Sequence, residues 1–350
     1  LISEAVTGSK ASVGPPWFDR YTVPLALVLV ALSGIGPVIA WRRATAANAR
    51  RNFAAPVLSA ALALAVLSLA GAGRQPLALA MFCCAAFVAA SVAQEFLRGV
   101  RARRAMTGES TPGALVALVR RNRRRYGGYL IHVGMAVLFV GVAASSAFQN
   151  ARDVRLAPGQ SASVGDYRLT YVRPTAAVAN DPRGTGALLD LGAVLDVSRH
   201  GRHVVTLTPS RGYYPSLDPA QGSVGRLIGG EATSHVGLSA GLRRDIWTAI
   251  EPDMASLMPL VKRGNQVVPL VRPDLGLVAL AAIAQRYRAS PPPAQFRFLD
   301  SPLVTWIWLG GLIIFGGGLV ALWPAGGPVR LRAGARLASR SRLARDPGPA

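Results

Sequence analysis

Five apolar stretches, each about as long as a membrane span, divide the chain. A helix rises about 1.5 Å per residue, so about 20 apolar residues cross the hydrocarbon core of a bilayer. The first and last stretches carry no charge, and the fourth carries a single ionisable residue, a histidine. This pattern predicts transmembrane helices over 23–41, 53–72, 76–96, 127–148 and 303–323.

The segment between the fourth and fifth apolar stretches has a different pattern. Apolar residues alternate with polar or small residues over 167–171 and 189–197, as in half-buried strands. His200-Gly201 separates two such runs and predicts a hairpin turn. We expect a short helix over 276–288, and prolines 291–293 mark the return linker to the last helix. A segment of about 150 residues is large enough for its own core, so we predict a compact β-rich domain.

The net charge of +22 is informative because of where the arginines lie. They gather in 42–51, 98–125 and 330–345, which fall on one side of a membrane if five helices alternate. Cytoplasmic loops are enriched in Lys and Arg, so this side is predicted to be cytoplasmic. A soluble nucleic-acid-binding protein would not explain the apolar stretches or the mean hydropathy of +0.32. No nucleic-acid partner is therefore expected, whereas contact with membrane lipid is.

The predicted fold class is a polytopic α-helical membrane protein of about five transmembrane helices, with a β-rich extracytoplasmic domain inserted before the last helix. We expect it in the cell (inner) membrane. The chain starts at a leucine with no signal peptide before its first apolar stretch, so we expect a fragment or a split gene product. The predicted segments are an extracytoplasmic segment (1–22), three transmembrane helices (23–97), a basic cytoplasmic loop (98–126), a transmembrane helix with His132 (127–148), an extracytoplasmic β-rich domain (149–301), the last transmembrane helix (302–323) and a basic cytoplasmic tail (324–350).

Few residues offer chemistry through a motif. Cys83 and Cys84 are adjacent in an apolar stretch, which does not support a disulfide framework, a zinc site or a Cys-x-x-Cys redox pair. Glycines 316–318 lie in the last apolar stretch and predict a packing face, not a nucleotide loop. No motif places a histidine beside a serine as in hydrolases. His200 and His203 flank the predicted turn and are expected to be exposed.

His132 is the residue most indicative of function. It lies five residues into the fourth apolar stretch, roughly 7–8 Å from the cytoplasmic end at about 1.5 Å per residue. Ionisable groups within spans are rare and usually functional, and a neutral imidazole binds metals, including haem iron. Gly128 and Ala136, four residues to either side, would let a flat cofactor or another helix approach. Glu95, near a span end, is expected to be solvated.

Three roles for His132 remain open from spacing alone. It could be a cofactor ligand, a hydrogen-bonding histidine that packs between helices, or part of a proton or substrate site. The other transmembrane stretches carry no second ionisable group well within the span. Spacing therefore identifies the residue and leaves its role undecided.

Four stretches, in order, resemble the CcmF family of cytochrome c maturation proteins. The most recognisable of them is Arg-Asn-Arg-Arg-Arg-Tyr-Gly-Gly-Tyr-Leu-Ile-His-Val-Gly at 121–134. Residues 1–18 resemble the family's external segment before a span, and Gly-Leu-x-x-Asp-Ile-Trp at 241–247 resembles a motif of its last external domain. Trp-Ile-Trp-Leu-Gly-Gly at 306–311 resembles its final span. The resemblance covers roughly residues 1–325, and its specificity lies in the combined order.

This resemblance implies a haem lyase subunit, within a wider group of haem-handling membrane proteins. His132 matches the intramembrane histidine of the family's C-terminal half, which implies an axial ligand of an intramembrane b-type haem. The second ligand would be a histidine of the missing N-terminal half. A tryptophan-rich external motif and three further family histidines have no match here, so the chain is similar to the C-terminal half only and is not expected to be active alone.

The resemblance also implies a reaction and partners. The reaction joins haem vinyl groups to the two cysteines of a Cys-x-x-Cys-His apocytochrome c. The implied partners are the N-terminal half of the lyase, a haem chaperone, apocytochrome c and its thiol-handling maturation proteins. Two other classes are weighed against this hypothesis. One is a transporter or permease subunit, and the other is a non-enzymatic scaffold whose external domain docks assembly partners.

Overall fold

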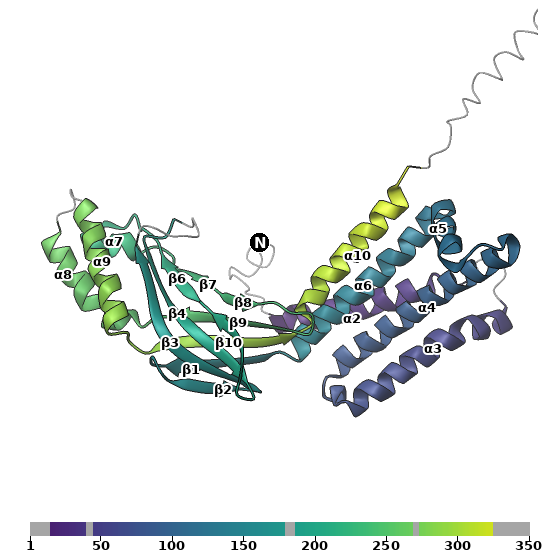
Figure 1. The fold of residues 1–350 in the computed structure, drawn as a ribbon, viewed down its shortest axis with the longest axis horizontal. Coiled ribbons are helices and arrows are strands. Elements are labelled where there is room, and N and C mark those ends of the chain that lie inside the picture. Colours follow the sequence, from purple (N-terminus) through teal and green to yellow (C-terminus); the bar gives the residue numbers. More distant parts are fainter. Residues whose placement is uncertain (1–14, 40–44, 179–185, 269–272, 325–350) are drawn as a thin grey trace, which may run out of the picture.

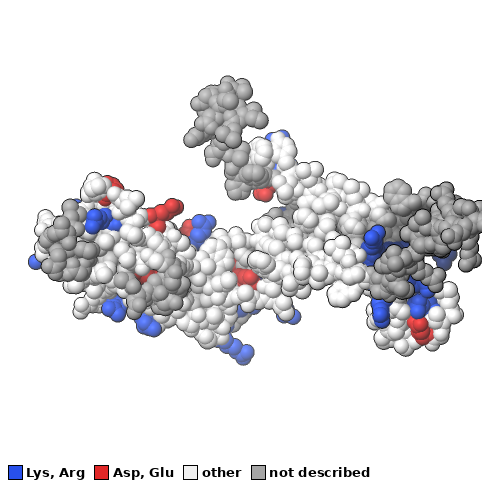
Figure 2. Space-filling model, turned by 90° about the horizontal axis from the view of Figure 1, so that it is seen from above, with Lys and Arg blue, Asp and Glu red and all other residues white. Residues whose placement is uncertain are grey.

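The structure of the protein is a computed structural model that describes residues 15–39, 45–178, 186–268 and 273–324. A bundle of long helices and a β-rich domain lie end to end along the molecule (Figure 1). On the face shown in Figure 2, charged side chains lie over the β-rich domain and at the far end of the bundle, and the bundle surface between them is largely uncharged. Most of the predicted N-terminal segment and nearly all of the predicted basic tail lie outside the described residues.

Four helices of the described ranges are long and apolar enough to cross a membrane: α3, α4, α6 and α10. They correspond to the second, third, fourth and fifth predicted spans, so the membrane part of the predicted fold class is confirmed for them. The helices of the bundle are α2 (Pro15–Ile35), α3 (Ala46–Leu69), α4 (Pro76–Thr107), α5 (Thr111–Arg121), α6 (Arg123–Ala147) and α10 (Val304–Leu322), with a short 3-10 turn η1 (Ala72–Arg74).

Two parts of the bundle differ from the sequence expectation. Helix α2 starts earlier than the predicted first span, carries Asp19 in its second turn and ends at Ile35. It is not among the four helices long and apolar enough to cross, so the count of five remains a prediction. The predicted basic loop is mostly helical, because α4 continues to Thr107 and α5 follows after a glycine in the left-handed conformation, Gly108 (φ 67°). Arginine favours helix, so charge alone does not mark a loop.

Helices α6 and α10 pack backbone against backbone. A Cβ at Gly127 would lie 2.6 Å from the carbonyl oxygen of Gly317, and a Cβ at Gly134 would lie 2.7 Å from the backbone nitrogen of Ile314. Small residues allow such close approach between membrane helices, where dispersion contacts replace the hydrophobic effect. The packing face predicted for glycines 316–318 is confirmed for Gly317, whereas Gly316 and Gly318 have no neighbour within 4 Å.

The predicted β-rich domain is present, and every strand pair recorded in it is antiparallel. A six-stranded sheet has the order β2-β3-β4-β6-β7 with β5 also pairing β4, and a four-stranded sheet has the order β1-β10-β9-β8. The strands are β1 (Asn150–Leu156), β2 (Ser161–Val164), β3 (Tyr167–Val178), β4 (Leu189–Arg199), β5 (Arg202–Leu207), β6 (Ser210–Tyr213), β7 (Thr233–His235), β8 (Gly237–Ser239), β9 (Arg244–Glu251) and β10 (Ala294–Pro302).

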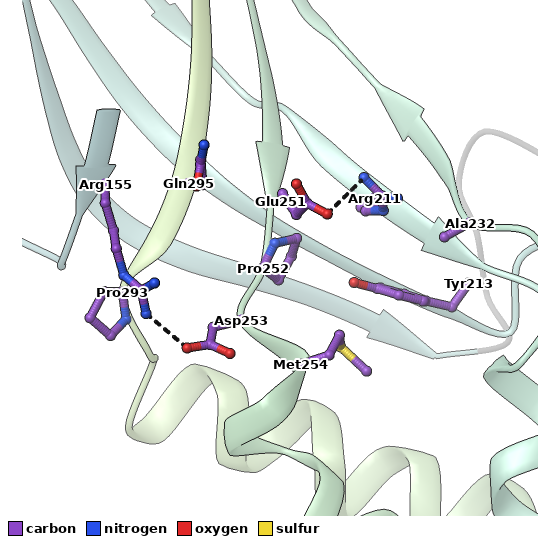
Figure 3. Close-up of a pocket in the computed structure, with 10 residues that line it drawn as sticks. All are labelled: Arg155, Arg211, Tyr213, Ala232, Glu251, Pro252, Asp253, Met254, Pro293 and Gln295. Atoms are coloured by element: carbon purple, nitrogen blue, oxygen red, sulfur yellow. Dashed lines mark hydrogen bonds and ion pairs between the residues drawn. The ribbon is translucent and has the colours of Figure 1, made fainter. Parts of the chain in front are cut away.

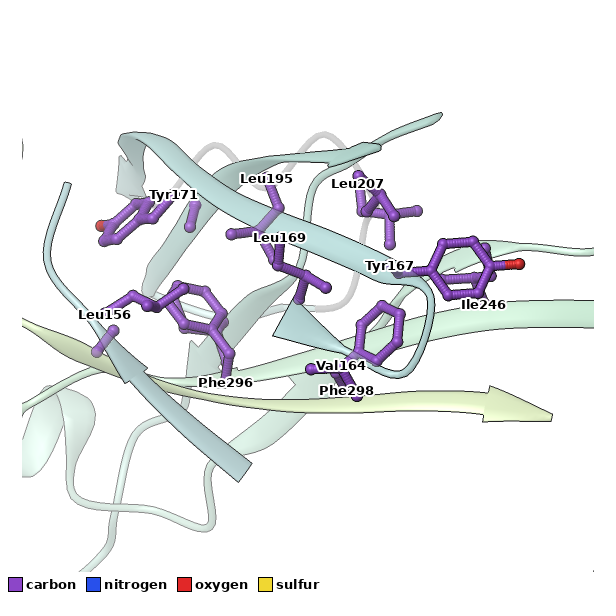
Figure 4. Close-up of a cluster of buried hydrophobic side chains, with 14 residues drawn as sticks. Leu156, Val164, Tyr167, Leu169, Tyr171, Leu195, Leu207, Ile246, Phe296 and Phe298 are labelled. Atoms are coloured by element: carbon purple, nitrogen blue, oxygen red, sulfur yellow. The ribbon is translucent and has the colours of Figure 1, made fainter. Parts of the chain in front are cut away.

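The two sheets enclose an apolar core between them (Figure 4). Leu169 and Tyr171 from one sheet and Phe296 and Phe298 from the other are fully buried, and the rings of Tyr171 and Phe296 lie 5.1 Å apart. The predicted alternation is confirmed, since every second residue of β4 points into a core. The predicted hairpin is also confirmed, because His200 (φ 50°) and Gly201 (φ 75°) form the two-residue turn between β4 and β5.

A second core lies at the end of the domain away from the bundle. Helices α7 (Gly222–Ile228), α8 (Met258–Val267) and α9 (Pro273–Ala289) cover the six-stranded sheet there (Figure 1). The short 3-10 turns η2 (Pro219–Gln221) and η3 (Met254–Ser256) precede α7 and α8. Helix α9 confirms the predicted helix over 276–288. Prolines 291–293 lead into β10 and not directly into the last helix, because strand β10 intervenes.

Candidate functional site

His132 lies in α6, in the half of the helix nearer to the arginine-rich end. Its side chain is half-buried, and its Nδ1 atom is buried without a hydrogen-bond partner in the structure. Leaving a buried polar atom unpaired costs about 1–3 kcal/mol. A packing histidine held by hydrogen bonds, one of the three open roles, therefore finds no support among the described residues. An imidazole of this kind retains the capacity to bind a ligand.

The two small neighbours of His132 have different surroundings. Gly128, one turn before it, has nothing within 4 Å of where a Cβ would be, whereas Ala136, one turn after it, is 3% exposed in the bundle core. We predicted that Gly128 and Ala136 both leave space beside α6 for a cofactor or another helix, and only Gly128 has such open space. The glycines of α6 that contact another helix are Gly127, Gly134 and Gly141, on the α10 side.

Helix α6 consequently has a packed face and an open face. The packed side meets α10 through glycines, and a neighbouring side meets α2 and α4 through Tyr129, Val133 and Ala136. At 100° per residue, His132 lies at the edge of the α2 and α4 side, next to the open position of Gly128. A planar group could reach the imidazole from that open side without moving the helix pair.

A charged network lies one turn from His132 towards the basic end. The Arg125 guanidinium donates to the Tyr129 hydroxyl (2.7 Å) and to a carboxylate oxygen of Glu95 on α4 (2.5 Å), and Arg98 also pairs with Glu95 (3.3 Å). The Glu95 side chain is only 11% exposed. The expectation of a solvated Glu95 is wrong, because its two arginine partners allow it to be buried. The sequence did not reveal this link between α4 and α6.

A largely apolar cavity of about 350 Å³ lies at the other end of α6, among α2, α4 and α6. Phe139, seven residues after His132 and therefore on the same side of the helix, lines it together with Ala26 and Met81. Asp19 and Ser146 contribute polar atoms at its edge. The open side of α6 thus continues from the histidine to the end that joins the β-rich domain.

The other candidate residues do not assemble with His132. His200 is exposed in the hairpin turn, and exposed His203 contacts Asp196 at 2.6 Å, so both expectations of exposure are confirmed. His235 ends strand β7 with a buried, unpaired Nε2. Cys83 and Cys84 are both free thiols. Within the described ranges, no three His, Cys, Asp or Glu side chains come together as a metal site.

A polar cavity of about 360 Å³ opens on the β-rich domain near the start of η3 (Figure 3). Two ion pairs line it: Arg155 with Asp253 at 2.9 Å, and Arg211 with Glu251 at 3.8 Å. Tyr213 lies beside them, and burial raises its pKa to about 12. Within each ion pair the two opposite charges neutralise each other, so this cavity suits a polar surface of mixed charge. Sequence patterning did not indicate it, since its residues come from five separate segments.

Known proteins give this arrangement a context. No family model matches the chain. The cytochrome c-type biogenesis protein CcmF of Pseudomonas aeruginosa is 27% identical over 325 residues, and that of Pseudomonas fluorescens is 29% identical over 323 residues. The CcmF protein of Escherichia coli is 24% identical over 332 residues. Each alignment covers 92% of this chain, and the chain spans only about 40% of the length of these relatives.

A solved structure agrees with these sequence matches. The structure of the cytochrome c haem lyase CcmF superposes with a TM-score of 0.54 at 21% identity, over 89% of this chain and 41% of that protein. At this identity the likeness concerns the fold, a helical membrane part with an inserted β-rich domain. The chain is thus related over nearly its whole length to the CcmF proteins of cytochrome c-type biogenesis, as the ordered motifs indicated, and it is consistent with the C-terminal half of such a protein.

Proposed function

We propose that the chain is a membrane subunit of a cytochrome c haem lyase, helping to attach haem covalently to apocytochrome c. The proposal is supported by its relatives, which are named for cytochrome c-type biogenesis, and by the fold it shares with a haem lyase. Because the chain spans about 40% of those proteins, the remaining residues of the catalytic machinery would come from another polypeptide or from the rest of a longer one.

We further propose that His132 is an axial ligand of a b-type haem within the membrane. The single observation that carries this proposal is the half-buried imidazole with an unpaired, buried Nδ1 atom beside the open face at Gly128. Bound there, a haem would supply one-electron redox chemistry. The chain's own residues would bind the iron through one imidazole nitrogen and keep the opposite side of α6 fixed against α10. The second axial ligand would be a histidine of the N-terminal half.

The cell membrane is the proposed location, with the β-rich domain on the outside. Its partners there would be the N-terminal half, a haem chaperone and apocytochrome c with its thiol-handling maturation proteins. The polar cavity of Figure 3 favours a second, compatible role as a scaffold, because paired charges on the rim of a cavity suit contact with a polar protein surface.

The haem assignment is tested on the chain co-purified with its N-terminal half. We expect a b-type haem absorption spectrum that His132→Ala abolishes. Gly128→Leu keeps the imidazole and fills the open face, so it is expected to reduce the haem content as well. His203→Ala changes an exposed histidine of the external domain and is the matched control. A full spectrum in His132→Ala would rule out this ligand.

A further inference from the structure

A basic pocket lies at the end of the bundle opposite the β-rich domain. It has a volume of about 530 Å³ and lies between residues 120–125, where α5 ends and α6 begins, and residues 321–324, where α10 ends. Lys and Arg side chains are visible at this end of the molecule in Figure 2. Neither His132 nor the β-rich domain lines this pocket, so the proposed haem function does not account for it.

Five arginines line the pocket, and few of their charges are neutralised. Arg125 is paired with Glu95. Arg123 donates its Nη1 hydrogens to the carbonyl oxygens of Trp323 (3.1 Å) and Pro324 (2.5 Å) at the end of α10. These partners are uncharged, so the positive charge of Arg123 is not neutralised. Arg120, Arg121 and Arg124 form no ion pair with a described residue, and none of the described residues that line the pocket is acidic. An unneutralised concave cluster attracts an anion.

The backbone adds to this attraction. Helix α6 starts inside the pocket, and its N-cap residue Asn122 makes no side-chain cap hydrogen bond. The first N–H groups of a helix have no partner within that helix, and the helix dipole places partial positive charge there. Arginine presents several N–H donors in a fork that fits phosphate oxygens. Phosphate suits both the donors and the charge of this pocket.

The apolar side chains next to the pocket point to a lipid as the source of the phosphate. Trp323 lies at the rim and is 68% exposed, as expected for a ring in the headgroup zone. Leu322 at the rim is 84% exposed, and the α10 surface leading away from it carries exposed Phe315 and Leu319. A bound headgroup would therefore have apolar helix surface directly below it for acyl chains. A soluble phosphate compound would not use that surface.

We propose that this pocket binds the phosphate of an anionic phospholipid, whose acyl chains lie along α10. Basic pockets between transmembrane helices bind acidic headgroups in this way. The bound lipid would bridge the first turn of α6 and the last turn of α10, the two helices that pack through glycines near His132.

The test uses the purified full chain in mild detergent with equal amounts of phosphatidylglycerol and phosphatidylcholine, and native mass spectrometry counts the retained lipids. We expect preferential retention of phosphatidylglycerol. The variant Arg120→Gln/Arg121→Gln/Arg124→Gln should weaken it at least about tenfold, since it removes three of the five arginines that line the pocket. The control Arg50→Gln/Arg51→Gln/Arg101→Gln removes the same charge from exposed sites on α3 and α4 and should retain the lipid.

Three results would overturn the proposal. Equal retention of the two lipids by the unchanged chain would show that no acidic headgroup is selected. An equal loss in the control variant would show that overall charge, and not this pocket, holds the lipid. Displacement of phosphatidylglycerol by inorganic phosphate or ATP would identify a soluble phosphate compound as the ligand in place of a lipid.

Discussion

Two tyrosines of the β-rich domain are almost completely buried. Tyr287 is fully buried in the second core and donates to the carbonyl oxygen of Gly192 at 3.3 Å. Tyr213 is 7% exposed and reaches the polar cavity of Figure 3. Burial raises the pKa of Tyr213 to about 12 and raises the pKa of Tyr287 further. Ionising either tyrosine within the folded domain is therefore unfavourable.

This burial predicts loss of stability in alkali. The raised pKa means that the stabilisation is fully present below the ordinary tyrosine pKa of about 10 and is lost as the pH rises towards the folded pKa. For Tyr213 the effect is roughly 2–3 kcal/mol across that window. Tyr213→Phe should therefore raise the pH at which the β-sheet circular dichroism of the full chain is lost. Tyr214→Phe, at a less buried neighbour, should not; an equal shift there would contradict the argument.

At the residue scale, sequence reasoning found His132 and missed its surroundings. A lone histidine in an apolar stretch is visible in the sequence because charge and polarity are so scarce there. The burial of Glu95 depends on Arg98 and on Arg125, which lies 30 residues away and on a different helix. Such a pair leaves no periodic signal. The unpaired Nδ1 of His132 likewise follows from the position of neighbouring helices, which patterning along one chain does not give.

At the element scale, the tightest packing of α6 is against α10. Gly134 faces α10 so closely that a Cβ would lie 2.7 Å from a backbone nitrogen of Ile314, and Gly310 meets the backbone at Leu138 in the same way. Contacts of backbone with backbone cannot be relieved by a change of rotamer. Adding one methyl group must therefore push the helices apart or distort them.

We predict that Gly134→Ala lowers the stability of the detergent-solubilised protein by about 1–3 kcal/mol, the usual cost of overpacking. Gly316→Ala is the matched control on α10, because a Cβ there meets nothing within 4 Å and alanine favours helix. Thermal unfolding followed by circular dichroism measures both. If the two variants unfold at the same temperature, the close packing of α6 on α10 is wrong.

The elements themselves show where patterning is reliable. Long apolar stretches and strict alternation predicted α3, α6, α10, β3 and β4, because burial in lipid or in a sandwich core imposes those periods directly. Short strands such as β7 and β8 have three residues each and carry no period. Strand β10 was missed because the prolines before it resemble a linker. Its pairing with β1, more than a hundred residues earlier, is a long-range contact that a local pattern cannot contain.

At the scale of the whole molecule, the β-rich domain is held firmly to the start of α10. Trp306 donates its indole N–H to the carbonyl oxygen of Leu242 (3.0 Å), and Thr305 donates to a carboxylate oxygen of Asp245 (3.2 Å). The N–H of Gly241 also donates to Asp245 (2.9 Å), which is 6% exposed. The stretches 241–247 and 306–311, noticed separately in the sequence, therefore meet at one junction.

The same junction connects three of the four resembling stretches in space. The stretch 306–311 contacts the stretch 241–247 at its start, and its Gly310 contacts Gly134 of the stretch 121–134. Three short pieces of sequence thus form one continuous contact from the β-rich domain to the helix of His132. This contact fixes how the β-rich domain is placed relative to the end of α6 that joins it.

The final prediction concerns the orientation of the molecule. Both connections of the β-rich domain leave the same end of the bundle, and α5 with the arginine-lined pocket lies at the other end (Figure 1). The excess of arginine predicts that this second end is cytoplasmic. With Cys83 and Cys84 changed to serine, a membrane-impermeant maleimide should label Ser163→Cys in intact spheroplasts and should label Met106→Cys only after lysis. Both positions are exposed, so accessibility within the fold does not distinguish them. The reverse pattern would place the β-rich domain in the cytoplasm and remove it from the compartment where c-type cytochromes are completed.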